Sequence, residues 1–161
     1  IALSLVGSEM CIRDSNRIAP EIIGNIERGL NIKPSQIFEA ERVRIELFKK
    51  ILVFFETHDF LICPAASIAP FSVDQRYVTE IDGKPCETYI DWFSITFALT
   101  MTACPTISVP CGFTSEGLPV GVQIMGKPRG EGELLLAAKQ FEAAIGISAQ
   151  LPITPQKQEL T

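Results

Sequence analysis

Hydrophobic positions recur at three- and four-residue steps in three segments of this chain, which is the period of an amphipathic helix. The segments expected to be helical are 18–30, 34–56 and 133–145. In the second segment the apolar stripe consists of Ala40, Val43, Leu47, Ile51, Phe54 and Phe55. We expect this stripe to face the core. Pro34 suits the first turn of that helix, where its missing N–H costs nothing.

Short apolar runs between the helices predict β-strands. Strands are expected at 60–63, 76–81, 106–109 and 120–125. The last two flank a polar turn at Glu116-Gly117, so we expect them to form an antiparallel pair. Asp82-Gly83 is a hairpin signal that follows the second strand. The order of helices and strands, without an internal repeat, predicts an α/β fold.

The segment 88–101 is expected to be one largely apolar helix, preceded by a proline-punctuated loop at 65–73. An uncharged run from Trp92 to Ser115 raises the question of membrane insertion. Its helical part, 92–104, is far shorter than the roughly 20 residues that span a bilayer. We therefore expect a buried helix that leads into a strand, and no membrane segment.

The composition is that of a globular protein, with 47% hydrophobic and 20% charged residues. The net charge is 14 − 19 = −5 over 161 residues, which argues against nucleic acid as a partner. The chain has five cysteines, an odd number, and no C-x-x-C motif. This pattern predicts reduced thiols in a cytoplasmic protein. With a single histidine, neither a metal site nor a cofactor is expected.

A Cys–His hydrolase is one conceivable chemistry, with His58 beside Cys63, Cys104 or Cys111. His58 follows a charged helix end, however, which favours a solvated residue that interacts with the helix dipole. Gln123 lies within an apolar strand, where a core amide bonded to neighbouring backbone is the simpler interpretation.

The opening segment, 1–15, reads IALSLVGSEMCIRDS and has neither an initiator Met nor the basic start of a signal peptide. It resembles the translated adapter read-through found at the ends of metagenomic gene fragments. We therefore expect that 1–15 is not native, that Cys11 is irrelevant, and that the gene continues upstream of Asn16. Residues 16–161 are then the native part.

Five short motifs in residues 16–161, taken together, carry a resemblance to one protein family. The stretches are PTISVPCG at 105–112, GLPVGVQIMG at 117–126, ELL at 133–135, DFLICP at 59–64 and YIDW at 89–92. They resemble the C-terminal region of the amidase signature family. The resemblance implies the C-terminal portion of an amidase domain. Its fold would be part of an α/β/α layered structure with a mixed sheet flanked by helices, incomplete in this chain.

The resemblance implies hydrolysis of a carboxylic amide to an acid and ammonia or an amine, by a Ser-Ser-Lys mechanism. The family's catalytic residues lie in a Gly/Ser-rich region that would be upstream of this chain, so no catalytic residue is carried over. None of the serines matches that motif: Ser67, Ser72, Ser94, Ser108 and Ser115. The chain alone is expected to be inactive.

Asp91 and Trp92 are the expected substrate-binding residues, because a carboxylate and an indole at a helix start offer a polar and an apolar contact. The simpler interpretation is a first-turn acid with an aromatic packing anchor. Thr100 and Ala103 depart from the family, where Asn and Gly are usual. Both lie before Pro105, in the turn that approaches the active-site region.

Two alternatives stay open. The first is the A subunit of a tRNA-dependent amidotransferase, which releases ammonia from glutamine. The spacing from Asp91-Trp92 to Pro105 resembles simple amidases more. The second is a non-catalytic α/β binding module. The expected partner is a small-molecule amide, with no nucleic acid and no membrane, and a homodimer is an open possibility.

Overall fold

A computed structural model describes residues 20–147 of the chain. The helices are α2 (Pro20–Leu30), α3 (Pro34–Phe54), α4 (Ser94–Thr100) and α5 (Glu131–Ile145), with a 3-10 turn, η2 (Asp91–Phe93), directly before α4. The strands are β1 (Phe60–Pro64), β2 (Glu80–Ile81), β3 (Lys84–Pro85), β4 (Thr106–Phe113) and β5 (Pro119–Gly126). The adapter-like segment 1–15 lies outside the described residues.

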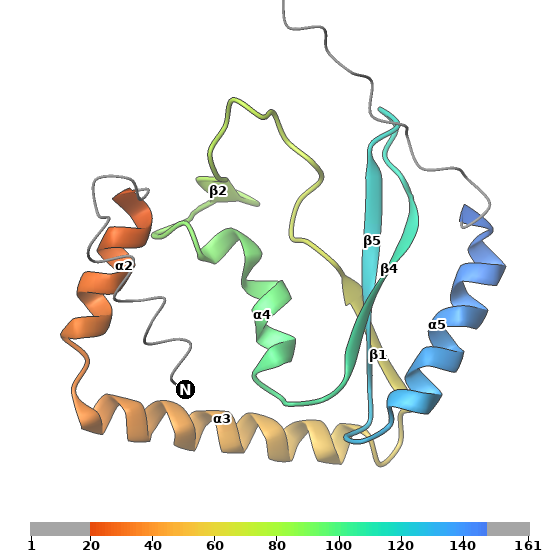
Figure 1. The fold of residues 1–161 in the computed structure, drawn as a ribbon, viewed down its shortest axis with the longest axis horizontal. Helices are drawn as coiled ribbons and strands as arrows, with labels where there is room; N and C mark the ends of the chain where they lie inside the picture. The colour runs from red at the N-terminus through yellow and green to blue at the C-terminus, as the bar shows by residue number, and fades with distance from the viewer. Residues whose placement is uncertain (1–19, 148–161) are drawn as a thin grey trace, which may run out of the picture.

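A three-stranded sheet of order β1-β5-β4 lies between α4 and α5 (Figure 1). Every pairing among the described strands is antiparallel. Strands β4 and β5 pair along their length, with a register shift between Pro110 and Gly112. Their connecting turn is closed by the Thr114 N–H, which donates to the Leu118 carbonyl, and contains Gly117 at a φ of +79°. The expected antiparallel pair is confirmed, and both strands are longer than expected.

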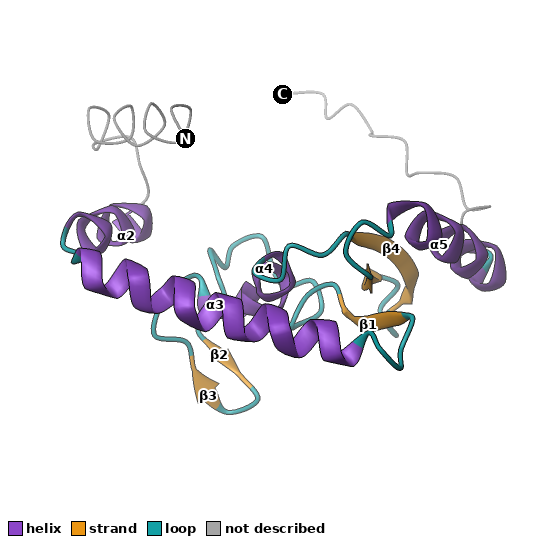
Figure 2. Ribbon diagram, turned by 90° about the horizontal axis from the view of Figure 1, so that it is seen from below, coloured by secondary structure: helices purple, strands orange, loops and turns teal. Residues whose placement is uncertain are grey.

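The sheet buries apolar side chains on both faces. On the α5 side the buried cluster is Val109, Ile124, Leu134 and Ala138. On the opposite side, beside the end of α3 and α4, the cluster is Phe55, Cys104 and Met125. Neighbouring residues of β5 therefore serve opposite layers, as the alternation of a strand requires. Figures 1 and 2 show α5 on one side of the sheet and α3 and α4 on the other, which confirms the layered α/β class.

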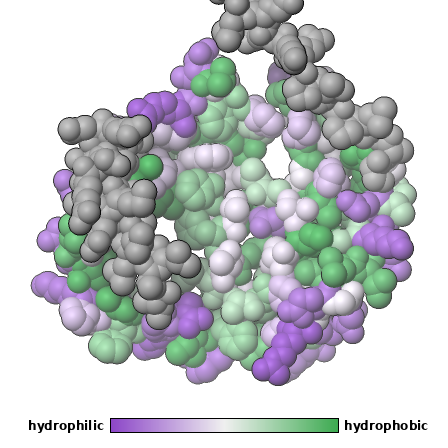
Figure 3. Space-filling model, in the orientation of Figure 1, coloured by the Kyte–Doolittle hydropathy of each residue, from purple (hydrophilic) through white to green (hydrophobic). Residues whose placement is uncertain are grey.

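The apolar stripe of α3 is covered only near its C-terminus. Ile51 and Phe54 pack against the second cluster, whereas Val43 is 54% exposed. A helix of 21 residues is about 32 Å long at about 1.5 Å per residue, and the sheet lies beside its last turns only. The expectation that the whole stripe faces the core is therefore wrong for the N-terminal half of α3. Figure 3 shows hydrophobic residues at the surface along this helix and near α5.

Two further expectations need correction. The segment 88–101 is not one helix: residues 88–90 form a turn, and η2 and α4 follow. The Asp91 carboxylate accepts hydrogen bonds from the Thr88 N–H and hydroxyl, and these bonds fix the turn in place of a first helical turn. The strand expected at 76–81 is reduced to β2, because only Glu80 and Ile81 find partners in β3.

Candidate functional site

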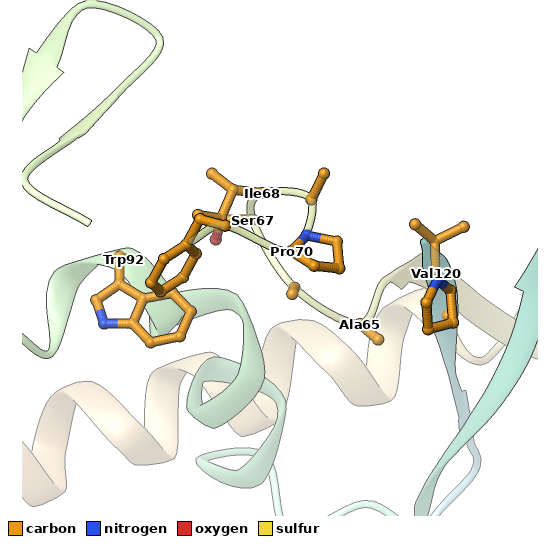
Figure 4. Close-up of a pocket in the computed structure, with 11 residues that line it drawn as sticks. Ala65, Ser67, Ile68, Pro70, Trp92 and Val120 are labelled. Atoms are coloured by element: carbon orange, nitrogen blue, oxygen red, sulfur yellow. The ribbon is translucent and has the colours of Figure 1, made fainter. Parts of the chain in front are cut away.

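An open pocket of about 590 Å³ lies beside the end of β1, between the loop 65–71, Trp92 and the start of β5. Its size is that of a small-molecule site. The described residues that line it are Ala65, Ala66, Ser67, Ile68, Ala69, Pro70, Phe71, Trp92, Pro119, Val120 and Gly121. Figure 4 shows Trp92 at one end of the pocket and Val120 at the other, with the loop between them.

Three hydrogen bonds, two with β5 and one with α4, fix the start of this loop. The Ala65 N–H donates to the Gly121 carbonyl at 2.9 Å, which continues the β1–β5 ladder by one residue. The Thr96 hydroxyl of α4 donates to the Ala65 carbonyl at 3.2 Å. The Gln123 amide donates to the Pro64 carbonyl at 3.1 Å. The expectation that Gln123 is a core amide bonded to backbone is thus confirmed, and its bond positions the pocket loop.

Gly121 has a steric reason to be glycine. A Cβ added there would lie 3.1 Å from the Val109 carbonyl oxygen and 3.5 Å from the Ala65 Cβ. The first distance is tighter than ordinary contacts, so a side chain at this position would push β4 and the loop apart. Ala65 and Gly121 both line the pocket at this close approach.

Aromatic contacts orient Trp92. Its ring meets Phe71 edge to face, with centroids 5.6 Å apart and an interplanar angle of 88°. It also meets Phe93 edge to face at 5.3 Å, and Phe93 contacts Phe97 in the same geometry. Such pairs are favourable arrangements of aromatic quadrupoles. The indole therefore lies between the loop residue Phe71 and Phe93 of η2, as a wall of the pocket.

Asp91, the other expected substrate-binding residue, faces a different groove. This shallow groove of about 530 Å³ lies against the hairpin of β2 and β3, where Asp91 lies near Lys84 and Glu87. The hydrogen bond from the Thr88 N–H is the main cause that lowers the pKa of the Asp91 carboxyl. Although Asp91 and Trp92 are adjacent in the sequence, their side chains line two separate hollows.

The hydrolase considered for His58 finds no support in the surroundings of its ring. The ring stacks on Phe54 at 4.2 Å, and Nδ1 lies 3.1 Å from the Phe54 carbonyl at the end of α3. This is the expected position at a helix terminus. Burial raises the pKa of the Cys63 thiol, the opposite of what a nucleophilic cysteine needs.

Residues 20–147 contain neither a candidate metal site nor a candidate membrane span. No group of three His, Cys, Asp or Glu side chains gathers there in a way that could hold a metal ion. None of the helices in this range combines the length and hydropathy that a bilayer span requires.

Most pocket residues were not singled out by the sequence, which pointed only to Trp92. The signal that could have found the others is the composition of 65–71, AASIAPF, which has one hydroxyl and no charge although it is a loop. An uncharged, apolar loop at the surface of a protein indicates a binding surface. The contribution of 119–121 depends on strand register and carries no local signal.

The structure is that of a layered α/β protein with an open, mainly apolar pocket. The family model described as Amidase matches residues 15–135, three quarters of the chain. The chain belongs to the amidase signature family. A relative, the A subunit of the glutamyl-tRNA(Gln) amidotransferase of Alkaliphilus metalliredigens (strain QYMF), is 34% identical over 107 residues, covering 66% of this chain and 20% of the relative.

Solved structures share the fold. A bacterial aryl acylamidase of the amidase signature family superposes with a TM-score of 0.75 at 23% identity, covering 94% of this chain and 34% of that chain. The A subunit of the glutamyl-tRNA(Gln) amidotransferase from Thermotoga maritima gives a TM-score of 0.54 at 24% identity, covering 80% of this chain and 25% of that one. The chain spans about a fifth of the length of the curated relatives it matches.

Proposed function

We propose that this chain is the C-terminal part of an amidase that hydrolyses a carboxylic amide to an acid and ammonia or an amine. The observation that carries the proposal is the pocket between the loop 65–71, Trp92 and β5, found in a member of a family of amide hydrolases. In this proposal the Ser-Ser-Lys residues belong to a region that precedes the matched one. The isolated chain then has no turnover, because it holds a wall of the site without the nucleophile.

Trp92 and Asp91 are the proposed substrate contacts. Trp92 offers its indole face to the substrate within the pocket. The Asp91 carboxylate accepts hydrogen bonds from the Thr88 hydroxyl and the Thr88 N–H. A carboxylate oxygen accepts more than one hydrogen bond, so acceptor capacity remains for a polar substrate group.

The test begins with the reading frame upstream of Asn16. A Gly/Ser-rich stretch with a suitable lysine supports the amidase, whereas a start codon near Asn16 supports the non-catalytic binding module. In the extended protein, Asp91→Ala should change kcat/KM across a set of amides without loss of the fold. Asp59→Ala is the matched control, because Asp59 is exposed and pairs with Lys127 on the surface. Equal kcat/KM values for Asp91→Ala and the parent would leave Asp91 a turn-forming residue only.

The A subunit of an amidotransferase is the second candidate, favoured by the 34% identity to such subunits. Affinity purification of the extended protein discriminates the two. Co-purification of stoichiometric partner subunits that bind tRNA supports the amidotransferase, and a free enzyme or homodimer that hydrolyses amides supports the simple amidase.

A further inference from the structure

The pocket beside Trp92 is free of ionisable side chains. Of the eleven described residues that line it, none carries a charge at neutral pH. The side-chain hydrogen-bonding groups among them are the Ser67 hydroxyl and the Trp92 indole N–H. A carboxylate or ammonium group that entered would lose water without gaining a counter-ion from this wall, which is costly.

The shape of the wall suits a flat ring. Trp92 and Phe71 stand edge to face at one end, so a third ring can add to the pair in the same favourable geometry. The rings of Pro70 and Pro119 add rigid apolar surface. Because Gln123, Thr96 and Gly121 hold the start of the loop by hydrogen bonds, much of this surface exists before any ligand binds.

We infer that this pocket binds an uncharged aryl group of the amide substrate and rejects amides that carry charge on that group. This inference rests on the proposed function and names its substrate class. The inference distinguishes a simple amidase from an amidotransferase subunit that uses glutamine. Glutamine carries both an ammonium and a carboxylate, and an uncharged apolar pocket disfavours such a substrate. In such a site Phe71 and Trp92 determine specificity through their contact with the ring, and they take no part in bond cleavage.

Trp92 is the only tryptophan of the chain, so its fluorescence reports on the pocket directly. The chain is titrated with benzamide, with 4-carbamoylbenzoate and with glutamine, under excitation selective for tryptophan. Benzamide should change the emission of Trp92 in a saturable way. 4-Carbamoylbenzoate differs from benzamide by one carboxylate and should bind about tenfold or more weakly, as expected for a desolvated, unpaired charge. Glutamine should leave the emission unchanged.

A matched pair of variants tests whether benzamide binds in this pocket. Ile68→Asp places a charge in the lining and should weaken benzamide binding about tenfold or more. Val73→Asp introduces the same charge a few residues away, at a side chain that is 97% exposed and outside the pocket lining. This control variant should bind benzamide as the parent chain does. Phe71→Ala should weaken benzamide binding by removing the edge-to-face partner, and circular dichroism establishes that each variant is folded.

Three outcomes overturn the inference: no saturable response to benzamide, equal binding of benzamide and 4-carbamoylbenzoate, or equal weakening by Ile68→Asp and Val73→Asp. These outcomes differ from failure of the proposed function. If benzamide binds as expected and the upstream frame lacks a Gly/Ser-rich stretch, the aryl site stands and the hydrolase does not. If glutamine binds in place of benzamide, the hydrolase stands and the substrate class does not.

Discussion

The side-chain amide of Gln123 donates a hydrogen bond of 3.1 Å to the carbonyl of Pro64, across 59 residues of sequence. Gln123 is buried in the middle strand of the sheet, and Pro64 is the last residue of β1. The bond therefore connects the core to the point where the pocket loop departs. The polar side chain of Gln123, within an apolar strand, thus positions the start of the pocket loop.

Replacing Gln123 by methionine keeps the approximate volume and removes the donor. We expect the free energy of unfolding to fall by about 1–3 kcal/mol, because the Pro64 carbonyl loses its partner. Chemical denaturation measures this change. Gln140→Met on the exposed side of α5 is the control and should stay within about 0.5 kcal/mol. Equal effects of the two substitutions would show that the hydrogen bond contributes nothing to stability.

Ala103 occupies a left-handed backbone conformation, with a φ of +55°. An L-residue other than glycine in that region costs roughly 1–2 kcal/mol. Ala103→Gly should therefore stabilise the fold by about 1 kcal/mol, although glycine raises the entropy of the unfolded chain. The control is Ala98→Gly within α4, where the same change should destabilise by about 1 kcal/mol. Thermal unfolding of the two variants should shift in opposite directions, and a shift of both to lower temperature would contradict the argument.

Asp91 should make stability depend on acid pH. Its pKa is lowered from the ordinary 3.8 in the folded state, mainly by the hydrogen bond from the Thr88 N–H. A lowered folded-state pKa means that the stabilisation is present above the unfolded pKa and is lost as the pH falls through the folded value. Thr88→Val removes the hydroxyl donor and should raise the pKa of Asp91 toward the ordinary value, as measured by NMR titration. Thr96→Val, whose hydroxyl bonds Ala65 instead, should leave the titration of Asp91 unchanged.

Local pattern was enough to predict β4 and β5 and their antiparallel pairing. The runs at 106–109 and 120–125 are apolar, and the turn between them holds Gly117 at a φ that favours glycine. The helix starting at Pro34 was equally visible, because proline is suited to a first turn. In each case the deciding interactions connect residues that are close in the sequence.

The remaining features depend on contacts that no local pattern contains. The break in 88–101 comes from the two hydrogen bonds between Asp91 and Thr88, which compete with a regular helix start. The pocket arises where Ala65 and Gly121 meet, 56 residues apart, in a register set by β1 and β5. Because tertiary contacts create this site, the sequence could indicate Trp92 and could not indicate what surrounds it.

Removal of residues 1–15 should leave stability unchanged or improved. On the adapter interpretation, this segment was not selected to pack against the core of the protein. Thermal unfolding of the chain that begins at Asn16, compared with the full chain, measures the difference. A loss of more than about 1 kcal/mol, a typical effect of one substitution, would count against the adapter interpretation.

The exposed apolar positions of α3 should cause the isolated chain to associate. Phe38 is 76% exposed and Val53 is 62% exposed, and Ile37 and Val43 of the same helix are also more than half exposed. Exposed apolar side chains that gather into a larger patch mark a contact surface or promote aggregation. Phe38→Glu combined with Val53→Glu should reduce the apparent mass in light scattering and leave the helix content unchanged, because neither side chain belongs to a buried cluster. Met125→Glu, at a side chain that is 0% exposed, should by contrast unfold the chain, because it buries an unpaired charge in the core. If the α3 double variant associates as strongly as the parent, the contact surface lies elsewhere, and the exposed Leu135 and Leu136 of α5 are then the next positions to change.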